Sequence, residues 1–186
     1  PQNFAHLYRT APFAARWIIP RAPKPYTRGF SWFNVSIPVR SDTIALGRGI
    51  RTAAERVIQL IRYLRRTRPT MAKPVITGFS QGGMLSFAVA AHYPSEIKAS
   101  LPMAGALPSS IYPMERPSVP ILALHGIRDH IVPYADAVRT IKALKALGAQ
   151  AELTGFPQAR HRPNPPMRQK MFALLETLIR PETSAK

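Results

Sequence analysis

Residues 73–92 read Lys-Pro-Val-Ile-Thr-Gly-Phe-Ser-Gln-Gly-Gly-Met-Leu-Ser-Phe-Ala-Val-Ala-Ala-His, the most informative stretch of the chain about its architecture. The apolar run before Gly78 predicts a short buried strand, and the small apolar residues after Ser80 predict a helix that ends before Pro94. At their junction, Gly-Phe-Ser-Gln-Gly matches the pattern G-x-S-x-G, which places a serine hydroxyl on a sharp turn above a strand. An ordinary glycine-rich turn is the alternative. We predict that Ser80 is a nucleophile.

The rest of the chain continues the alternation of strand and helix. Short apolar runs predict strands, and amphipathic segments with a helical period predict helices. Such an alternation is typical of an α/β fold whose mostly parallel sheet has helices on both faces. We expect one domain over residues 1–186. The further predicted strands are 16–20, 99–105, 119–126 and 149–156, the helices are 43–66, 134–147 and 167–179, and the loops are 21–41 and 106–118.

Two residues after later predicted strands complete a possible catalytic constellation. A serine nucleophile needs a base, and the base needs a carboxylate that orients it. Asp129 follows the strand 119–126, and His161 follows the strand 149–156, in the order Ser, Asp, His. The other histidines fit less well, and His125, which ends a strand, is expected to be a structural hydrogen-bonding group.

These motifs resemble the phospholipase/carboxylesterase family of α/β-hydrolases, which includes the acyl-protein thioesterases. The resemblance extends over almost the whole chain. It implies hydrolysis of carboxylic esters or thioesters of small to medium acyl chains by Ser80, His161 and Asp129 through an acyl-enzyme, with no metal or organic cofactor. The stretches that carry it are Gly78–Gly83, Gly105–Pro108, His125–Pro133 and Phe156–His161, with Pro20–Pro23 and Ser31–Asn34 as weaker matches.

The resemblance also predicts how an oxyanion would be held. The backbone N–H of Gln81 is expected in the oxyanion hole. Separately from the resemblance, the apolar residues Trp32, Phe33 and Leu107 are candidates for an acyl pocket near the nucleophile, with ordinary core or loop packing as the alternative. Members of the family begin with a strand and a His-Gly-x-Gly loop that supplies another N–H group, and neither is found before the run at 16–20. Together with the start at Pro1, this leads us to expect an N-terminally truncated hydrolase domain.

The strong positive charge favours other function classes only weakly. The chain of 186 residues has 26 Lys and Arg against 9 Asp and Glu, a net charge of +17, and no Cys. Zero Cys excludes disulfides and thiol nucleophiles. The densest basic run, Arg62 to Arg68, fits the solvated end of a helix better than a nucleic-acid module. Two alternatives to an active esterase remain: a truncated, catalytically poor hydrolase homologue, and a basic binding module on a hydrolase scaffold.

The expected partner is therefore a small-molecule ester or thioester. We expect no nucleic acid, and no apolar run reaches the length of about 18 residues that a membrane span requires. A cytoplasmic location is expected, with loss of an N-terminal signal as the alternative. The sequence makes no prediction about the oligomeric state.

Overall fold

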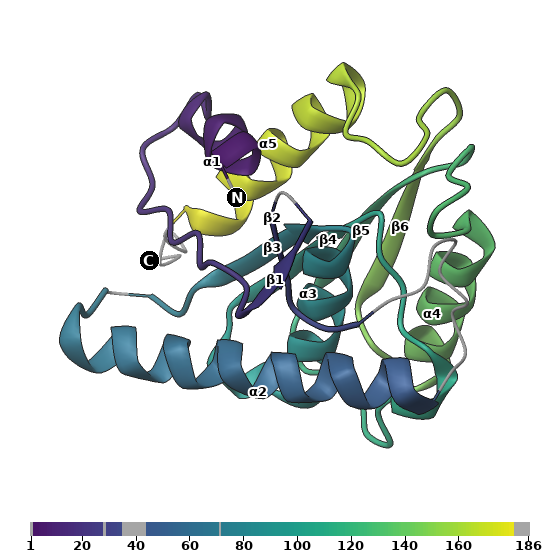
Figure 1. Ribbon diagram of the computed structural model, residues 1–186, viewed down its shortest axis with the longest axis horizontal. Helices are drawn as coiled ribbons and strands as arrows, with labels where there is room; N and C mark the ends of the chain where they lie inside the picture. Colours follow the sequence, from purple (N-terminus) through teal and green to yellow (C-terminus); the bar gives the residue numbers. More distant parts are fainter. Residues whose placement is uncertain (1, 28, 35–43, 71, 181–186) are drawn as a thin grey trace, which may run out of the picture.

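A computed structural model describes residues 2–27, 29–34, 44–70 and 72–180 (Figure 1). Helices and strands alternate from α2 onward, as the apolar pattern predicts, except that β4 and β5 are joined by a loop, also predicted, which contains a short 3-10 turn. In chain order the elements are α1 (Gln2–Arg9), β1 (Lys24–Tyr26), β2 (Gly29–Ser31), α2 (Ile44–Thr67), β3 (Val75–Phe79), α3 (Gln81–His92), the 3-10 turn η1 (Pro94–Glu96), β4 (Ala99–Met103), the 3-10 turn η2 (Ser109–Ile111), β5 (Ile121–Gly126), α4 (Tyr134–Ala146), β6 (Ala151–Phe156) and α5 (Pro165–Ile179).

The four longer strands form one parallel sheet in the order β3-β4-β5-β6. Each strand pairs with the next strand along the chain; Val75 lies opposite Ala99, for example, and Ile121 lies opposite Ala151. The prediction of a parallel sheet is confirmed. In such a sheet the carboxyl ends of all strands lie at one edge, which brings together the turns that follow β3, β5 and β6.

Helices cover both faces of this sheet, which confirms the second part of the fold prediction (Figure 1). Ile121 and Ala123 of β5 belong to the larger apolar core, to which α2, α3 and α4 contribute. Leu124, the next residue along the strand, belongs to the core with α1 and α5. Neighbouring side chains of a strand point to opposite faces, so the two cores lie on the two sides of the sheet.

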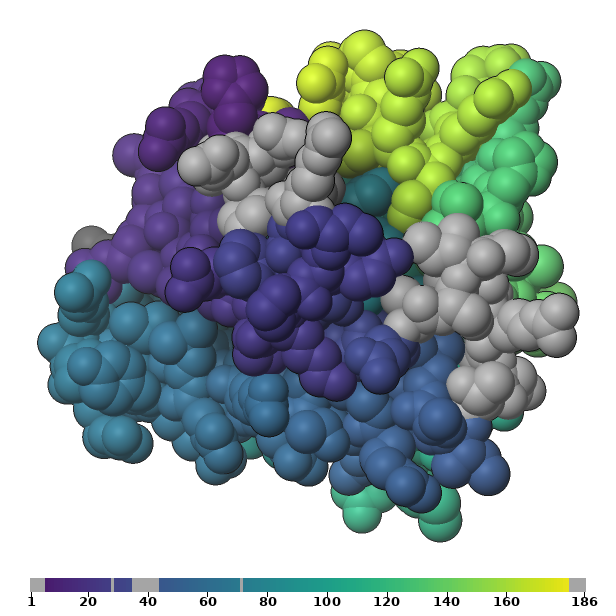
Figure 2. Space-filling model, viewed as in Figure 1, coloured from purple at the N-terminus to yellow at the C-terminus, as the bar shows by residue number. Residues whose placement is uncertain are grey.

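The N-terminal region differs from the sequence prediction. Residues 16–20 form no strand, and Ile18 and Ile19 are 47% and 38% exposed. The segment is held by ring contacts instead, because Trp17 stacks on Tyr8 of α1 at 4.9 Å between ring centroids. The predicted loop 21–41 contains the antiparallel hairpin β1–β2, and its residues 28 and 35–41 lie outside the described residues. Figure 2 shows this N-terminal part, purple to dark blue, over the middle of one face above α2.

The basic end of α2 is partly neutralised. Arg62 Nε lies 2.8 Å from one carboxylate oxygen of Glu96, and Arg65 lies 3.3 Å from the other. Two of the four arginines in the densest basic run therefore have an acidic partner within the protein. Among the described residues, no helix combines the length and the apolar character that a membrane crossing requires.

Candidate active site

Ser80 occupies a strained turn between β3 and α3. Its backbone has φ 57° and ψ −115°, a conformation that residues other than glycine rarely adopt. The turn is fixed on both sides, because the Ser80 N–H donates to the carbonyl of Met103 and the Ser80 carbonyl accepts from the Met84 N–H, both at 2.9 Å. Such strain persists only where the surroundings impose it, and it is typical of functional sites.

Three glycines make this turn possible by close backbone approach. A Cβ on Gly78 would lie 2.6 Å from the backbone of Gly82, and a Cβ on Gly83 would lie 2.3 Å from the carbonyl oxygen of Met103. A Cβ on Gly105, after β4, would lie 2.6 Å from the backbone of Gly83. The turn therefore packs against the end of β4 with no room for side chains.

His161 approaches Ser80 from the loop that follows β6. Its Nε2 lies 2.9 Å from Ser80 Oγ, and its Nδ1 lies 2.7 Å from Asp129 Oδ2. The ring also contacts Phe79, with 4.8 Å between the ring centroids. The structure thus brings the three predicted residues into one hydrogen-bonded chain from Ser80 through His161 to Asp129.

The loop that carries His161 crosses the end of β5, where Gly126 leaves room for it. A Cβ at Gly126 would lie 2.5 Å from the carbonyl oxygen of Ala159. Two backbone hydrogen bonds hold the crossing, from Ile127 N–H to the carbonyl of Phe156 and from Arg128 N–H to that of Ala159, both at 3.0 Å. The same short stretch after β5 therefore positions both Asp129 and the loop of His161.

Asp129 is buried and accepts several hydrogen bonds. Its Oδ1 accepts from the backbone N–H groups of Ile131 and Val132, both at 2.9 Å, and its Oδ2 lies 3.4 Å from His125 Nε2. Burial by itself raises the pKa of a carboxyl group. Here the hydrogen bonds from His125, His161 and Val132 outweigh burial and hold the pKa of Asp129 below its usual range. Asp129 is therefore an anion at neutral pH.

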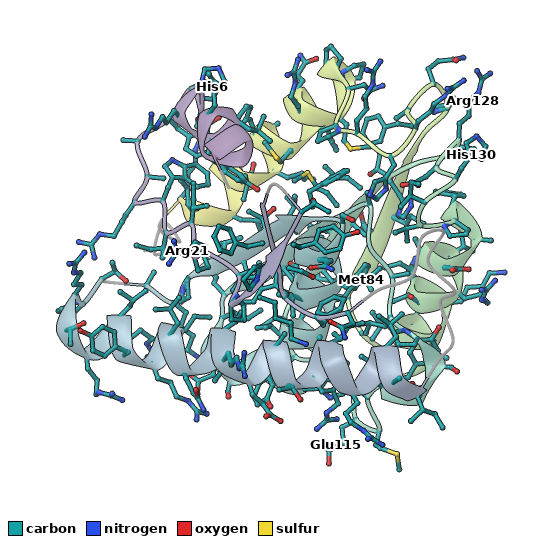
Figure 3. All side chains as sticks on the ribbon, in the orientation of Figure 1. His6, Arg21, Met84, Glu115, Arg128 and His130 are labelled. Atoms are coloured by element: carbon teal, nitrogen blue, oxygen red, sulfur yellow. The ribbon has the colours of Figure 1, made fainter. Side chains whose placement is uncertain are left out.

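The remaining histidines lie elsewhere. His125 is buried, and its Nε2 lies 2.9 Å from the carbonyl oxygen of Val132, which confirms its expected structural hydrogen bond. His92 Nε2 lies 3.0 Å from the carbonyl oxygen of Ile111. His6 and His130 are exposed, and Figure 3 shows both at the periphery of the molecule. Within the described ranges, no three His, Asp or Glu side chains come together as a metal site would require.

A largely apolar cavity of about 960 Å³ opens beside Ser80. It runs along β3, between α2 and α5, and it is covered by residues 14–20; Ser80, Gln81 and His161 line one part of it. Of the three predicted pocket residues, Trp32 lines this cavity. Phe33 and Leu107 do not: both are 2% exposed and pack in the core with α2 and α3, so the structure assigns them a packing role.

Gln81 lies directly after Ser80, and its side chain makes several hydrogen bonds. It begins α3, so its backbone N–H belongs to the first turn, where such groups have no partner within the helix. Its side-chain amide is hydrogen-bonded to Ser31, Trp32 and Phe33. No sequence pattern predicts these contacts, because Gln81 and the residues about 50 positions before it share no motif. The only available signal was that Gln81 follows Ser80 directly.

Comparisons with known proteins agree with the fold and extend along most of the chain. The Phospholipase/Carboxylesterase family model matches residues 3–179. Carboxylesterase SOBER1 of Arabidopsis thaliana is 28% identical over 159 residues, which cover 79% of this chain and 70% of SOBER1. A rice (Oryza sativa subsp. japonica) protein named as a probable inactive carboxylesterase is also 28% identical, over 82% of this chain and 67% of its own length.

A more local similarity links the chain to another group of hydrolases. A putative carboxymethylenebutenolidase of Escherichia coli is 33% identical over 96 residues, which cover 47% of this chain. The matched part of that relative is only 35% of its length.

Solved structures show the same fold. The crystal structure of Arabidopsis thaliana SOBER1 has a TM-score of 0.72 with 24% identity, over 88% of this chain and 84% of that one. The crystal structure of Zea mays acyl-protein thioesterase 2 has a TM-score of 0.75 with 22% identity, over 95% and 87%. The predicted resemblance is thus confirmed along nearly the whole described fold, and the chain belongs to the phospholipase/carboxylesterase family of α/β-hydrolases.

Proposed function

We propose that this protein is a serine hydrolase that cleaves carboxylic esters or thioesters of small to medium acyl chains through a covalent acyl-enzyme. The observation that carries the proposal is the chain of hydrogen bonds from Ser80 Oγ to His161 Nε2 and from His161 Nδ1 to Asp129 Oδ2. The names of the carboxylesterase and thioesterase relatives support it. So does the apolar cavity, which offers an acyl chain a place beside the hydroxyl.

The first half of the reaction forms the acyl-enzyme. Ser80 Oγ attacks the carbonyl carbon while His161 Nε2 takes the hydroxyl proton. The tetrahedral oxyanion accepts a hydrogen bond from the Gln81 N–H, at the positive end of the α3 dipole. When the intermediate collapses, the bond to the alcohol or thiol breaks and His161 returns the proton to that leaving group.

The second half releases the acid. Water enters, His161 removes one of its protons, and the resulting nucleophile attacks the acyl carbon. Collapse of this intermediate breaks the bond to Ser80 Oγ, which regains its proton from His161. Throughout, Asp129 fixes the tautomer in which Nδ1 carries a proton, and it stabilises the imidazolium that forms in each half-reaction.

The test uses covalent labelling together with turnover. A fluorophosphonate probe should label the wild-type protein at Ser80, and the protein should release p-nitrophenol from p-nitrophenyl butyrate. Ser80→Ala should lose both signals and keep the wild-type circular dichroism spectrum. Ser95→Ala, a matched change at an exposed serine, should keep both. Unchanged hydrolysis in Ser80→Ala would overturn the proposal. Parallel assays with a thiocholine ester distinguish thioester from ester hydrolysis.

A catalytically poor homologue is the second candidate, and a specific observation favours it. Among the described residues we assign one oxyanion donor, the Gln81 N–H, and the lack of one donor of an oxyanion hole typically costs about 100- to 1,000-fold in turnover. The name of the rice relative, a probable inactive carboxylesterase, points in the same direction. This candidate predicts that the probe labels Ser80 stoichiometrically while p-nitrophenyl butyrate is hydrolysed no faster than in buffer.

The third hypothesis, a basic binding module, receives less support. Glu96 is an internal partner of Arg62 and Arg65, which leaves fewer free cations in the run that would contact phosphates. Filter binding to DNA at low salt tests it directly, and salt-dependent retention that Arg66→Gln and Arg68→Gln abolish would favour it.

A further inference from the structure

The side chain of Gln81 ties the end of the β1–β2 hairpin to the turn of Ser80. Gln81 Oε1 accepts a hydrogen bond from the Trp32 N–H at 2.9 Å. Gln81 Nε2 donates to Ser31 Oγ at 2.9 Å and to the Phe33 carbonyl at 3.0 Å. One amide group therefore holds three consecutive residues, which lie about 50 positions earlier in the chain.

The hydrogen-bonding pattern requires both a donor and an acceptor at this position. Gln81 Oε1 accepts from the Trp32 N–H, whereas Ser31 Oγ and the Phe33 carbonyl both accept from Gln81 Nε2. Ser31 Oγ donates to the same Phe33 carbonyl at 2.6 Å, so this hydroxyl can accept from Gln81 while its own proton is used. Ser31 is buried, and an unpaired polar group there would cost free energy. A glutamate carboxylate would lack the donor, and methionine and leucine would lack the donor as well.

The hydrogen bonds of Gln81 matter for substrate binding because one of their partners is Trp32. It lines the cavity that Ser80, Gln81 and His161 also line, and it packs against the main apolar core. Its backbone N–H is held by the residue directly after the nucleophile. The position of the Trp32 indole is thus coupled to the turn that carries Ser80, where the acyl-enzyme would form.

We propose that the side chain of Gln81 is a positioning residue that fixes Trp32 as a wall of the acyl pocket and so sets the preference for longer acyl groups. This inference rests on the proposed function. Gln81 then acts in two separable ways, because its backbone N–H faces the oxyanion while its side chain orders residues 31–33. A longer acyl chain gains about 0.8 kcal/mol for each CH₂ that it buries, provided that the wall stays in place.

The kinetic test compares two substrates of different chain length. For wild type and Gln81→Glu, kcat and KM are measured with p-nitrophenyl acetate and p-nitrophenyl octanoate. We expect the ratio of kcat/KM for octanoate to that for acetate to fall about tenfold in the variant, mainly through a higher KM for octanoate. Trp32→Ala should reduce the same ratio, and the double variant should show little further loss, since contacting residues that act together are not additive.

Matched variants separate positioning from general disruption. Ser31→Ala removes one acceptor of the Gln81 amide, lies outside the catalytic machinery and should lower the same ratio by a smaller factor. Gln59→Glu makes the identical chemical change at an exposed position of α2 and should leave the ratio unchanged. If Gln81→Glu fails to fold, Ser31→Ala and Trp32→Ala still test the proposal.

A second readout needs no catalysis. Hydrogen–deuterium exchange of residues 29–34 should be at least tenfold faster in Gln81→Glu than in wild type or Gln59→Glu. If the wild-type protein shows no hydrolysis, the proposed function is refuted. The exchange experiment then still tests whether the Gln81 side chain holds residues 31–33. Equal losses for acetate and octanoate in Gln81→Glu, or unchanged exchange at residues 29–34, would overturn the positioning role.

Discussion

His161 Nε2 lies 2.9 Å from Ser80 Oγ, although the two residues are 81 positions apart and follow opposite edge strands of the sheet. β3 and β6 are separated by three strand spacings, about 14 Å. The loop after β6 therefore has to return across the sheet, and it does so over Gly126 at the end of β5. The geometry of the candidate site depends on this crossing as well as on the three side chains.

Asp129→Asn should abolish most of the activity without loss of the fold. The amide keeps the shape of the carboxylate, and its oxygen is held by the N–H groups of Ile131 and Val132. Its NH₂ group therefore faces His161 Nδ1 and cannot accept a hydrogen bond, so the imidazole adopts the wrong tautomer. Loss of this partner typically lowers kcat by about 10⁴-fold. Steady-state hydrolysis of p-nitrophenyl butyrate measures the effect, and circular dichroism checks the fold. A decrease of less than tenfold would show that His161 does not depend on Asp129.

Gly126→Ala should impair catalysis by moving the loop of His161. The added Cβ would lie 2.5 Å from the carbonyl oxygen of Ala159, so the crossing loop must shift. A displacement of about 1 Å can cost about 100-fold in rate. Gly29→Ala is the matched control, because its Cβ would meet its nearest neighbour at 3.9 Å. We expect kcat to fall about 100-fold in Gly126→Ala and less than twofold in Gly29→Ala; equal rates in the two variants would contradict the role of the crossing.

His92 should make the fold sensitive to mild acid. Burial lowers the pKa of His92, the nearby Arg51 lowers it further, and the hydrogen bond to the Ile111 carbonyl opposes them only in part. Below about pH 6.5 the unfolded chain therefore binds a proton that the folded chain resists. Stability is lost as the pH falls from this value toward the lower pKa of the folded state.

Urea unfolding at pH 7 and pH 5 measures this loss. His92→Gln should show a smaller difference between the two pH values than wild type, whereas His130→Gln, at an exposed position, should show the wild-type difference. A wild-type difference in His92→Gln would assign the acid sensitivity to other groups.

Glu96→Gln should have little effect on stability. Its partners Arg62 and Arg65 are 54% and 46% exposed, and exposed ion pairs typically contribute less than about 1 kcal/mol. We expect a change in the free energy of unfolding below that value, and a smaller one at high salt, where charges are screened. Urea unfolding at low and high salt measures it. A loss of several kcal/mol would mean that the contact between η1 and α2 depends on this pair.

The central fold could be predicted because its strands are apolar runs separated by helical periods. Ala99–Met103 is buried along its whole length and Ile121–Gly126 along nearly all of it, and such strands stand out in a sequence. The hairpin β1–β2 could not be predicted, since its strands have three residues each and those of β1 are exposed. The run at 16–20 was misleading because apolar composition does not show whether a neighbouring strand is available for pairing.

The candidate site likewise has residues that could be predicted from the sequence and contacts that could not. Ser80, Asp129 and His161 follow strands in a parallel sheet, so the chain order alone indicates that they meet at one edge. The contacts of Gln81 depend on where a short hairpin folds back, which no local pattern encodes. The residue type alone leaves Phe33 as either a pocket residue or a core residue, and its packing in the main apolar core decides between the two.

The three glycines around Ser80 also limit how this site can change over time. Gly78, Gly83 and Gly105 each meet backbone atoms, which no neighbouring rotamer change can move aside. An added methyl group at any of them demands a shift of the main chain, so a change in a neighbouring side chain does not restore the fit. The side chains that border the cavity from residues 14–20, α2 and α5 are not tied to this turn, and substitutions there can change the shape of the cavity without moving the main chain at Ser80.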